Sequence, residues 1–186
     1  MQTRQLPGDF VVWLLVLLEL LTFGMLFAAF AGARLYNPAL FAAGQATLDL
    51  SSGAINTVFL VTASACAARA LHAVRHGGNK AGARWLLGAL ACGLGFVTVK
   101  SLEYVDKWRE GLDIAENSFT MLYVMLTGFH FLHALVGCLF FALVWAPTRR
   151  GAYGPRNCHT LETVTVFWHM VDLLWMVLFP LVYVLR

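Results

Sequence analysis

Three histidines in apolar stretches are the first candidates for chemistry, namely His130, His133 and His169. Imidazole nitrogens can hold a haem as paired axial ligands, or a copper or zinc ion in a set of three. Because His130 and His133 are three residues apart, one helix cannot place them on opposite faces of one haem, although this spacing suits a mononuclear or carboxylate-rich metal site. His169 has Asp172 as a partner one turn away. We therefore expect hydrogen-bonded core histidines and no metal, with a metal site as the alternative.

Glu19 is an isolated acidic residue near the middle of the first apolar stretch, without a basic residue one turn away. Ionisable side chains inside a membrane cost roughly 2.5–3.5 kcal/mol each on insertion scales, so they usually face other helices or a cavity. We expect a neutral Glu19 unless another helix supplies a partner. The residue either handles a proton or a lipid headgroup, or it forms an ordinary hydrogen bond between helices.

Lys100 and Glu103 are three residues apart, a spacing that predicts pairing on one helix face close to the end of a span. There, either side chain could also extend to water. No stretch resembles a nucleophile elbow, a phosphate-binding loop or a zincin helix, so we predict no catalytic residue.

Polar and small residues form two seams, with alternating spacings of three and four, in the last two apolar stretches. The first comprises Thr120, Tyr123, Thr127, His130, Ala134 and Gly137, and the second comprises Glu162, Thr165, His169, Asp172 and Met176. This heptad-like spacing places each seam on one helix face. We expect the two helices to face each other or a shared polar interior.

The composition indicates that these elements lie in a membrane. Of 186 residues, 60% are apolar and 12% are charged, and the mean hydropathy is +0.71, whereas soluble domains average about 45–50% apolar and about 25% charged residues. An ordinary soluble globule and a disordered chain are therefore excluded. The net charge of +3 comes from 13 basic and 10 acidic residues in short clusters, which argues against a nucleic-acid partner. The four cysteines form no C-x-x-C pair and are interpreted as core thiols.

Five continuous apolar runs are long enough to cross a bilayer as helices, at residues 10–33, 53–73, 84–104, 119–146 and 160–183. Their lack of alternation excludes a membrane barrel. The first run exceeds a signal-peptide core of about 7–15 residues, so we interpret it as a retained span. The prediction is an all-α, polytopic membrane protein with a single membrane domain over residues 1–186.

Basic residues near the ends of the spans predict the orientation in the membrane. The amino-terminal side carries eight, which are Arg4, Arg69, Arg75, Lys80, Arg84, Arg149, Arg150 and Arg156, and the other side carries four, which are Arg34, Lys107, Arg109 and Arg186. Because loops rich in Lys and Arg stay in the cytoplasm, the amino terminus is predicted to be cytoplasmic.

Several strings together resemble subunit III of the haem–copper oxidase superfamily, that is, cytochrome c oxidase subunit III. They are Asn56-Thr57, Glu103-Tyr104, Thr127-Gly128-Phe129-His130-Phe131-Leu132-His133 with Gly137, and Glu162 followed by Trp168-His169-Met170-Val171-Asp172-Leu173-Leu174-Trp175. The resemblance covers nearly the whole chain in one order. Glu19 lies where the family carries its membrane-embedded glutamate.

The resemblance implies a helical subunit that packs against catalytic subunit I and holds phospholipid in a V-shaped cleft between its first two helices and the remainder. It also implies support for proton uptake and for stability of the oxidase, with haem and iron or copper only in partner subunits. Glu19 is then the lipid-cleft or proton-handling candidate. The expected buried polar or interhelical residues are Asn56, Lys100, Glu103, Thr127, His130, His133, Glu162, His169, Asp172 and Trp175.

Full-length members of this family have seven spans, so this chain lacks the first two. Its short loops and its Leu-Phe-Pro-Leu ending are most similar to the short NorE-type branch, which is associated with nitric oxide reductase and denitrification. We predict a non-catalytic accessory subunit in the bacterial inner membrane, beside the catalytic subunit of nitric oxide reductase and its c-type cytochrome subunit. The lipid cleft would then persist at residues 10–33 and 53–73.

Two alternatives remain at this point. Within the family, the chain could be subunit III of a quinol or cytochrome c oxidase, with oxidase subunit I as partner. Outside the family, it could be an independent membrane enzyme or transporter that uses His130, His133, His169 and Asp172 as a metal site or proton relay.

Overall fold

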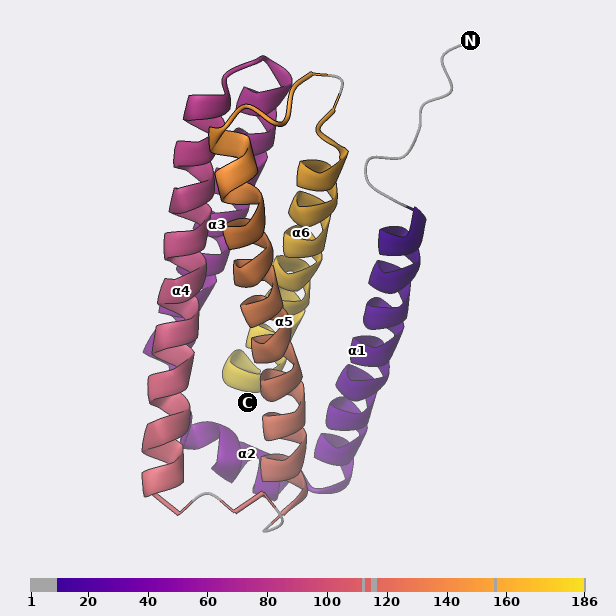
Figure 1. Ribbon diagram of the computed structural model, residues 1–186. Coiled ribbons are helices and arrows are strands. Elements are labelled where there is room, and N and C mark those ends of the chain that lie inside the picture. The colour runs from indigo at the N-terminus through magenta and orange to yellow at the C-terminus, as the bar shows by residue number, and fades with distance from the viewer. Residues whose placement is uncertain (1–9, 112, 115–116, 156, 186) are drawn as a thin grey trace.

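The computed structural model describes residues 10–111, 113–114, 117–155 and 157–185, and the regular secondary structure within these ranges is helical (Figure 1). The elements are α1 (Phe10–Tyr36), α2 (Pro38–Ala46), α3 (Leu50–Arg75), α4 (Asn79–Arg109), α5 (Ser118–Arg149), α6 (His159–Phe179) and a π-helical turn, η1 (Pro180–Val184). Five stretches are long and apolar enough to cross a membrane, namely α1, α3, α4, α5 and α6 with η1. The predicted fold class is confirmed.

Short polar residues begin two of the long helices. Asp49 caps α3 by accepting hydrogen bonds from the backbone N–H groups of Ser51 and Ser52, at 3.0 and 3.1 Å. The hydroxyl of Ser52 and the backbone N–H of Ser51 hold the pKa of the Asp49 carboxyl below its usual value. Asn117 caps α5 in the same way, through the backbone N–H of Thr120 at 2.8 Å. These caps fix where the chain enters the membrane helices.

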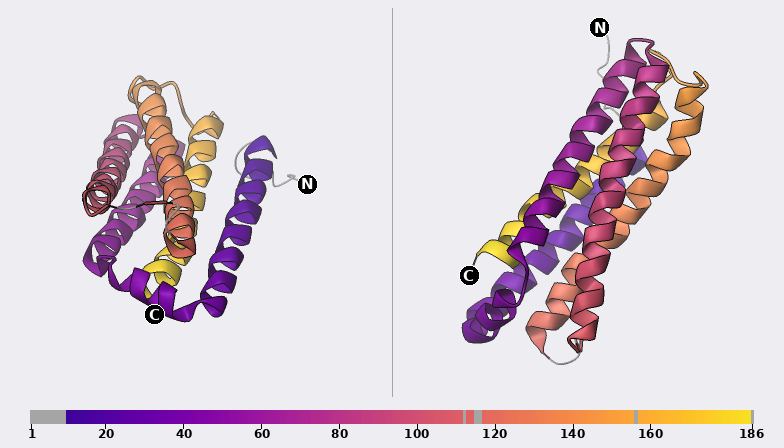
Figure 2. Two further views of the ribbon diagram at one scale, coloured as in Figure 1. Left: turned by 90° about the horizontal axis from the view of Figure 1, so that it is seen from below. Right: turned by 90° about the vertical axis from the view of Figure 1, so that its left-hand side faces the viewer.

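Helices α3, α4, α5 and α6 form a four-helix bundle, which Figure 2 shows from two further directions. Helix α3 lies along α4 because the residues between them are small, including the buried Ala67, Ala70 and Ala89. Between α5 and α6, a Cβ atom added to Gly137 of α5 would lie 2.6 Å from the indole of Trp168. The missing side chain therefore makes room for one of the two tryptophans of α6.

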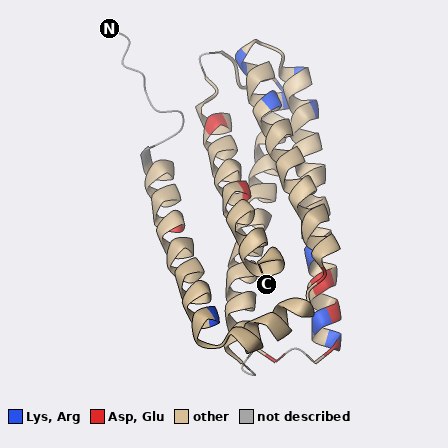
Figure 3. Cartoon of the chain, turned by 180° about the vertical axis from the view of Figure 1, so that it is seen from behind, with Lys and Arg blue, Asp and Glu red and all other residues tan. Residues whose placement is uncertain are grey.

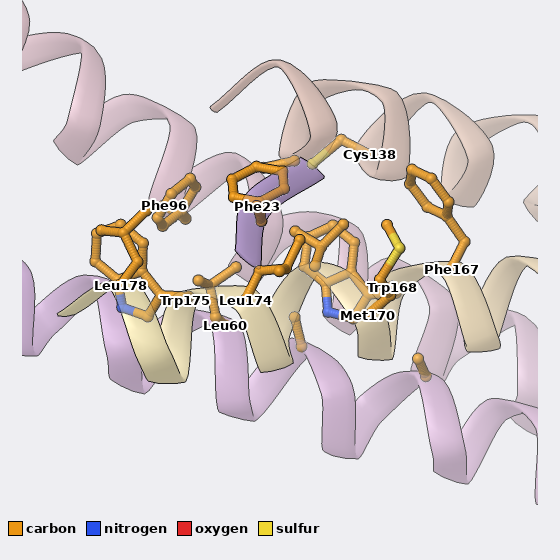
Figure 4. Close-up of a cluster of buried hydrophobic side chains, with 14 of the residues drawn as sticks. Phe23, Leu60, Phe96, Cys138, Phe167, Trp168, Met170, Leu174, Trp175 and Leu178 are labelled. Atoms are coloured by element: carbon orange, nitrogen blue, oxygen red, sulfur yellow. The ribbon is translucent and has the colours of Figure 1, made fainter. Parts of the chain in front are cut away.

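The centre of the bundle is aromatic and aliphatic. Figure 4 shows Trp168 and Trp175 of α6 at two positions along this cluster, with Leu60 of α3 and Phe23 of α1 between them and Phe96 of α4 beside Trp175. The rings of Phe96 and Trp175 meet edge to face, with centroids 5.2 Å apart. Such pairs add about 0.5–1.5 kcal/mol to the effect of burial.

Helix α1 stands beside this bundle and contacts it mainly through α5 and α6 (Figure 1). Its buried residues, Val16, Phe23 and Phe30, recur every seven positions on one face. The expected pairing of residues 10–33 with 53–73 on one side of a cleft is wrong, because the alanine-rich face of α3 packs into the bundle. A groove does border α1, but it lies between α1, α5 and α6.

Helix α2 occupies a segment that the sequence indicated as a loop. Asn37 and Pro38 begin it, and the chain then continues as a nine-residue helix. Phe41 is buried among aromatic rings, 5.1 Å from Phe30 of α1 and 5.5 Å from Phe119 of α5, measured between centroids. Contacts with the rest of the fold therefore determine this helix.

The carboxyl-terminal turn is held by α2. Pro180 begins η1, and the backbone carbonyls of Leu181 and Val182 at this helix end accept hydrogen bonds from the side-chain amide of Gln45, at 3.1 and 3.0 Å. The last carbonyls of a helix have no partner within the helix, so a side chain from elsewhere satisfies them. Gln45 is fully buried.

The two ends of the bundle differ in charge, as Figure 3 shows. We call the end that carries the α3–α4 turn and the α5–α6 loop the basic end, and its described basic residues are Arg69, Arg75, Lys80, Arg84, Arg149 and Arg150. The opposite end, with α2 and the α4–α5 loop, carries Asp106, Lys107, Arg109, Glu110 and Asp113. This separation matches the count from which the cytoplasmic amino terminus is predicted; the orientation itself stays a prediction.

Candidate functional site

A groove of about 350 Å³ lies between part of α1 and the bundle. Its lining is mostly apolar and comprises Val12, Leu15 and Glu19 of α1, Leu132, His133, Val136 and Phe140 of α5, and Thr163 and Phe167 of α6. We call it the α1 groove. In it, Glu19 Oε1 lies 3.1 Å from His133 Nε2. Another helix thus supplies the partner that Glu19 lacks on its own helix.

A backbone contact orients the imidazole of His133. Its Nδ1 lies 2.7 Å from the backbone carbonyl of Phe129, which can only accept, so Nδ1 carries a hydrogen. Nε2 is then the ring nitrogen that faces the Glu19 carboxyl group, at 3.1 Å.

The pair is only partly shielded from the membrane. The side chain of Glu19 is 23% exposed and that of His133 is 17% exposed. Phe23 packs edge-on against the imidazole, with centroids 5.6 Å apart, and Phe167 stacks on it at 6.4 Å. The arrangement can hold a polar group of a bound molecule, or exchange a proton with one.

His130 lies in a different environment, one turn away on the inner face of α5. It is fully buried between Phe96, at a centroid distance of 5.5 Å, and Trp175, at 5.2 Å. Neither ring nitrogen has a hydrogen-bond partner among the described residues. The expected hydrogen bond of His130 is therefore not found there, and aromatic packing takes its place.

His169 lies outside the α1 groove, beside α3, and it is exposed, so the expectation of a buried core histidine is wrong at this position. Its Nδ1 is 3.3 Å from the hydroxyl of Ser64, which donates to Asp172 Oδ2 at 2.7 Å. Ser64 thus connects the expected pair of His169 and Asp172, which do not form a direct ion pair among the described residues. The three histidines lie in three separate places, and no group of three or more possible metal ligands occurs in the described part of the chain.

The polar seam of α5 is buried in the bundle as predicted, but the seam of α6 is not opposite it. Glu162 accepts a hydrogen bond from Arg75 of α3 at 2.8 Å and from the thiol of Cys158 at 3.0 Å. His169 and Asp172 also reach α3 rather than α5. The two helices do face each other, as expected, but they meet through large apolar residues such as Trp168 and not through the two polar seams.

The Lys100–Glu103 pair forms the most deeply buried charged cluster among the described residues. Lys100 Nζ lies 2.9 Å from Glu103 Oε1, and their side chains are 0% and 7% exposed. Tyr123 and Tyr183 each donate a hydrogen bond to that oxygen at 2.6 Å. The predicted pairing is confirmed, whereas neither side chain extends to water.

Aromatic rings surround the Lys100 ammonium group. Its Nζ lies 4.9–5.3 Å from the ring centroids of Tyr104, Tyr123 and Tyr183. The hydroxyl of Tyr104 donates to Thr127 at 2.8 Å, which in turn donates to the carbonyl of Tyr123 at 2.7 Å. Tyr183 carries no local signal in the sequence, because its contact with Glu103 spans 80 positions.

The remaining predicted residues are buried as polar members of the helix interfaces. Trp175 donates its indole N–H to the hydroxyl of Thr57 at 2.9 Å and so joins α6 to α3. Asn56 is fully buried on α3, and its amide has no hydrogen-bond partner among the described residues.

Comparison with known proteins shows one family. Residues 8–186 match the family described as Cytochrome c oxidase subunit III. A "Cytochrome c oxidase subunit 3" from Synechocystis sp. is 30% identical over 177 residues, covering 95% of this chain and 75% of the relative. One from Thermostichus vulcanus is 30% identical over 182 residues, covering 96% and 89%.

A "Heme-copper oxidase subunit I+III" from Aeropyrum pernix is 27% identical over 179 residues, which cover 92% of this chain and 22% of the relative. These relatives are named as oxidase subunits, and none of the three carries a nitric oxide reductase name, so the NorE-type branch stays a prediction. With its five membrane helices and with the family match over residues 8–186, the chain belongs to the cytochrome c oxidase subunit III family.

Proposed function

We propose that this chain is an accessory subunit III of a haem–copper oxidase in a bacterial inner membrane, where it packs against subunit I and holds phospholipid in the α1 groove. The observation that carries the proposal is this groove of about 350 Å³, whose lining is apolar apart from the Glu19–His133 pair and Thr163. The names of the relatives, one of which is a subunit I+III, support subunit I as the partner. Haem and copper belong to that partner in this proposal.

Shape and polarity, rather than hydrophobicity, select the molecule in the groove. Lipid tails are as apolar as Val12 or Val136, so moving a tail from the bilayer into the groove gains no hydrophobic free energy. Retention therefore depends on how the tail packs between α1 and α5, and on a polar contact with Glu19 or His133.

A second candidate role, proton handling in support of proton uptake, is favoured by the 3.1 Å contact between Glu19 and His133, two groups that can each carry a proton. A net charge on this pair would lie in a groove bounded by apolar side chains, which is costly there. Proton exchange at this pair would therefore be coupled to a change in what occupies the groove.

The test is purification of the tagged chain from native membranes in a mild detergent, with mass spectrometry of partners and quantification of phospholipid per chain. Glu19→Gln keeps the size of the side chain and alters the pair, while Leu18→Gln puts the same amide on a neighbouring position that is 61% exposed. We expect oxidase subunits I and II among the partners, and less retained phospholipid for Glu19→Gln than for Leu18→Gln.

Each other outcome contradicts a separate part of the proposal. Recovery of a nitric oxide reductase catalytic subunit with its c-type cytochrome would replace the oxidase assignment by the NorE-type one. Recovery of the chain alone would favour an independent membrane protein. Equal phospholipid in both variants would remove the lipid role of Glu19, and unchanged proton uptake in Glu19→Gln would remove the proton role.

A further inference from the structure

A second surface pocket, of about 500 Å³, lies at the basic end between α4 and α5. It is lined by Lys80, Ala83, Arg84, Leu87, Trp145 and Arg149, and we call it the basic pocket. Three of the six residues are cations and none is acidic. Lys80, Arg84 and Leu87 follow each other at helical spacing along one face of α4, while Trp145 and Arg149 lie one turn apart on α5.

The three cations of the basic pocket, Lys80, Arg84 and Arg149, form no ion pair with any of the residues that the structure describes. Arg75, at the same end of the bundle, does have such a partner, since it pairs with Glu162 at 2.8 Å. The basic pocket is therefore a local concentration of uncompensated positive charge.

Tryptophans place the basic pocket at the boundary between hydrocarbon and water. The guanidinium of Arg149 lies 5.6 Å from the ring centroid of Trp145, and that of Arg69 lies 5.2 Å from the ring of Trp85 at the same end. Tryptophan is enriched at the level of the lipid headgroups, and basic side chains at helix ends extend to that level. Leu87 continues the pocket toward the hydrocarbon with an exposed apolar side chain.

We propose that the basic pocket binds the phosphate group of an anionic phospholipid, with the three cations around the headgroup and with one acyl chain beside Leu87. Arg guanidinium groups suit phosphate because they donate two parallel hydrogen bonds to its oxygens. One nitrogen of Arg84 faces the backbone carbonyl of Lys80 at 3.5 Å, so its two terminal nitrogens remain for the ligand. This site is separate from the α1 groove and does not depend on the identity of the catalytic partner.

The opposite end of the bundle shows why the presence of a cation alone does not make a phosphate site. Lys107 also lines a pocket, of about 330 Å³, but its ammonium is engaged by Glu110 at 2.8 Å and by the carbonyl of Thr47 at 2.8 Å. A phosphate there would have to compete with a carboxylate. Only the basic pocket, among these two, offers its cations to an anion from the membrane.

The experiment titrates phosphatidylglycerol into the chain purified with its partners in an uncharged detergent, and counts bound lipids by native mass spectrometry. Phosphatidylcholine serves as the zwitterionic comparison, and inorganic phosphate as the soluble one. The test variant carries Arg84→Gln and Arg149→Gln, and the matched control is Arg150→Gln, which removes a charge next to the pocket but outside its lining. All three positions are exposed, so these substitutions leave the packed core intact.

We expect wild type to prefer phosphatidylglycerol over phosphatidylcholine. At about fivefold in affinity for each basic residue near the headgroups, the double variant should bind phosphatidylglycerol about thirtyfold more weakly, and Arg150→Gln should change it by less than fivefold. Equal losses in both variants would show a general surface charge and overturn the site. Equal binding of the two lipids, or displacement of phosphatidylglycerol by millimolar inorganic phosphate, would overturn the lipid assignment without any need for a variant.

Discussion

The substitution Glu103→Gln should strongly destabilise the bundle, although it changes one atom of one side chain. Gln keeps an oxygen that can accept from Tyr123 and Tyr183, but it removes the negative charge 2.9 Å from Lys100. Breaking a buried ion pair by neutralising one partner costs about 3–5 kcal/mol. Because three tyrosine rings still face the ammonium group, we expect the lower half of that range.

A matched control lies one to two turns further along α4. Lys107 and Glu110 have the same spacing and an N–O distance of 2.8 Å, but the side chain of Glu110 is 64% exposed. Exposed pairs contribute about 0–1 kcal/mol, so Glu110→Gln should change the free energy of unfolding by less than about 1 kcal/mol. Both values can be measured by titration with sodium dodecyl sulfate in mixed micelles, followed by circular dichroism.

The double variant Lys100→Met, Glu103→Gln gives the sharpest test, because it removes the buried charge while keeping an acceptor for the tyrosines. It should be more stable than Glu103→Gln alone, since replacing a buried ion pair by uncharged groups is often neutral. A double variant that is less stable than the single one would refute the reasoning, as would equal losses for Glu103→Gln and Glu110→Gln.

Three further predictions concern other parts of the chain. Gly137→Val should lower the free energy of unfolding by about 1–3 kcal/mol, because the new Cβ would overlap the indole ring of Trp168. At Gly128 on the same helix, an added Cβ meets nothing within 4 Å, so Gly128→Ala should be neutral or stabilising. The detergent titration described above compares the two variants. Folding lowers the pKa of the Asp49 carboxyl, so this cap should stabilise the chain above about pH 4–5 and lose its effect as the pH falls through the folded pKa. Asp49→Ala should therefore cost about 1 kcal/mol at pH 7 and nothing at low pH, whereas Asp49→Asn should remove the pH dependence that this cap contributes. Unfolding measured at several pH values will show both effects. Burial and the neighbouring Glu162 raise the pKa of the Cys158 thiol, so its alkylation at pH 8 should be slow and should accelerate in Glu162→Gln, which peptide mass spectrometry can follow.

The long membrane helices could be predicted from the sequence because their signal is local. Each span is a continuous apolar run, and Asp49 or Asn117 marks the start of a helix within a few residues. Helix α2 was not predicted, because its nine residues are too few to cross a membrane and the search was for spans. Its stability comes from Phe41, which is buried by α1 and α5.

The candidate site was predictable only as a set of residues, not as a set of contacts. Glu19 stands out in sequence because it interrupts an apolar run, but nothing in the sequence shows that His133 faces it from α5. His169 and Asp172 are one turn apart and yet meet through Ser64 of α3. Periodicity places a residue on a helix face, whereas the packing of small against large residues decides which helix that face meets.

The enclosure of Lys100 by Tyr183 also has a consequence for the order of events during synthesis. The two residues that make the pair are translated together, but Tyr183 follows Glu103 by 80 positions. At about 5–20 residues per second, the ribosome reaches that tyrosine roughly 4–16 s later. During this interval, Tyr183 cannot yet cover the charged pair of α4. We therefore expect the end of α4 to stay near water, or beside an insertion factor, until η1 has been synthesised.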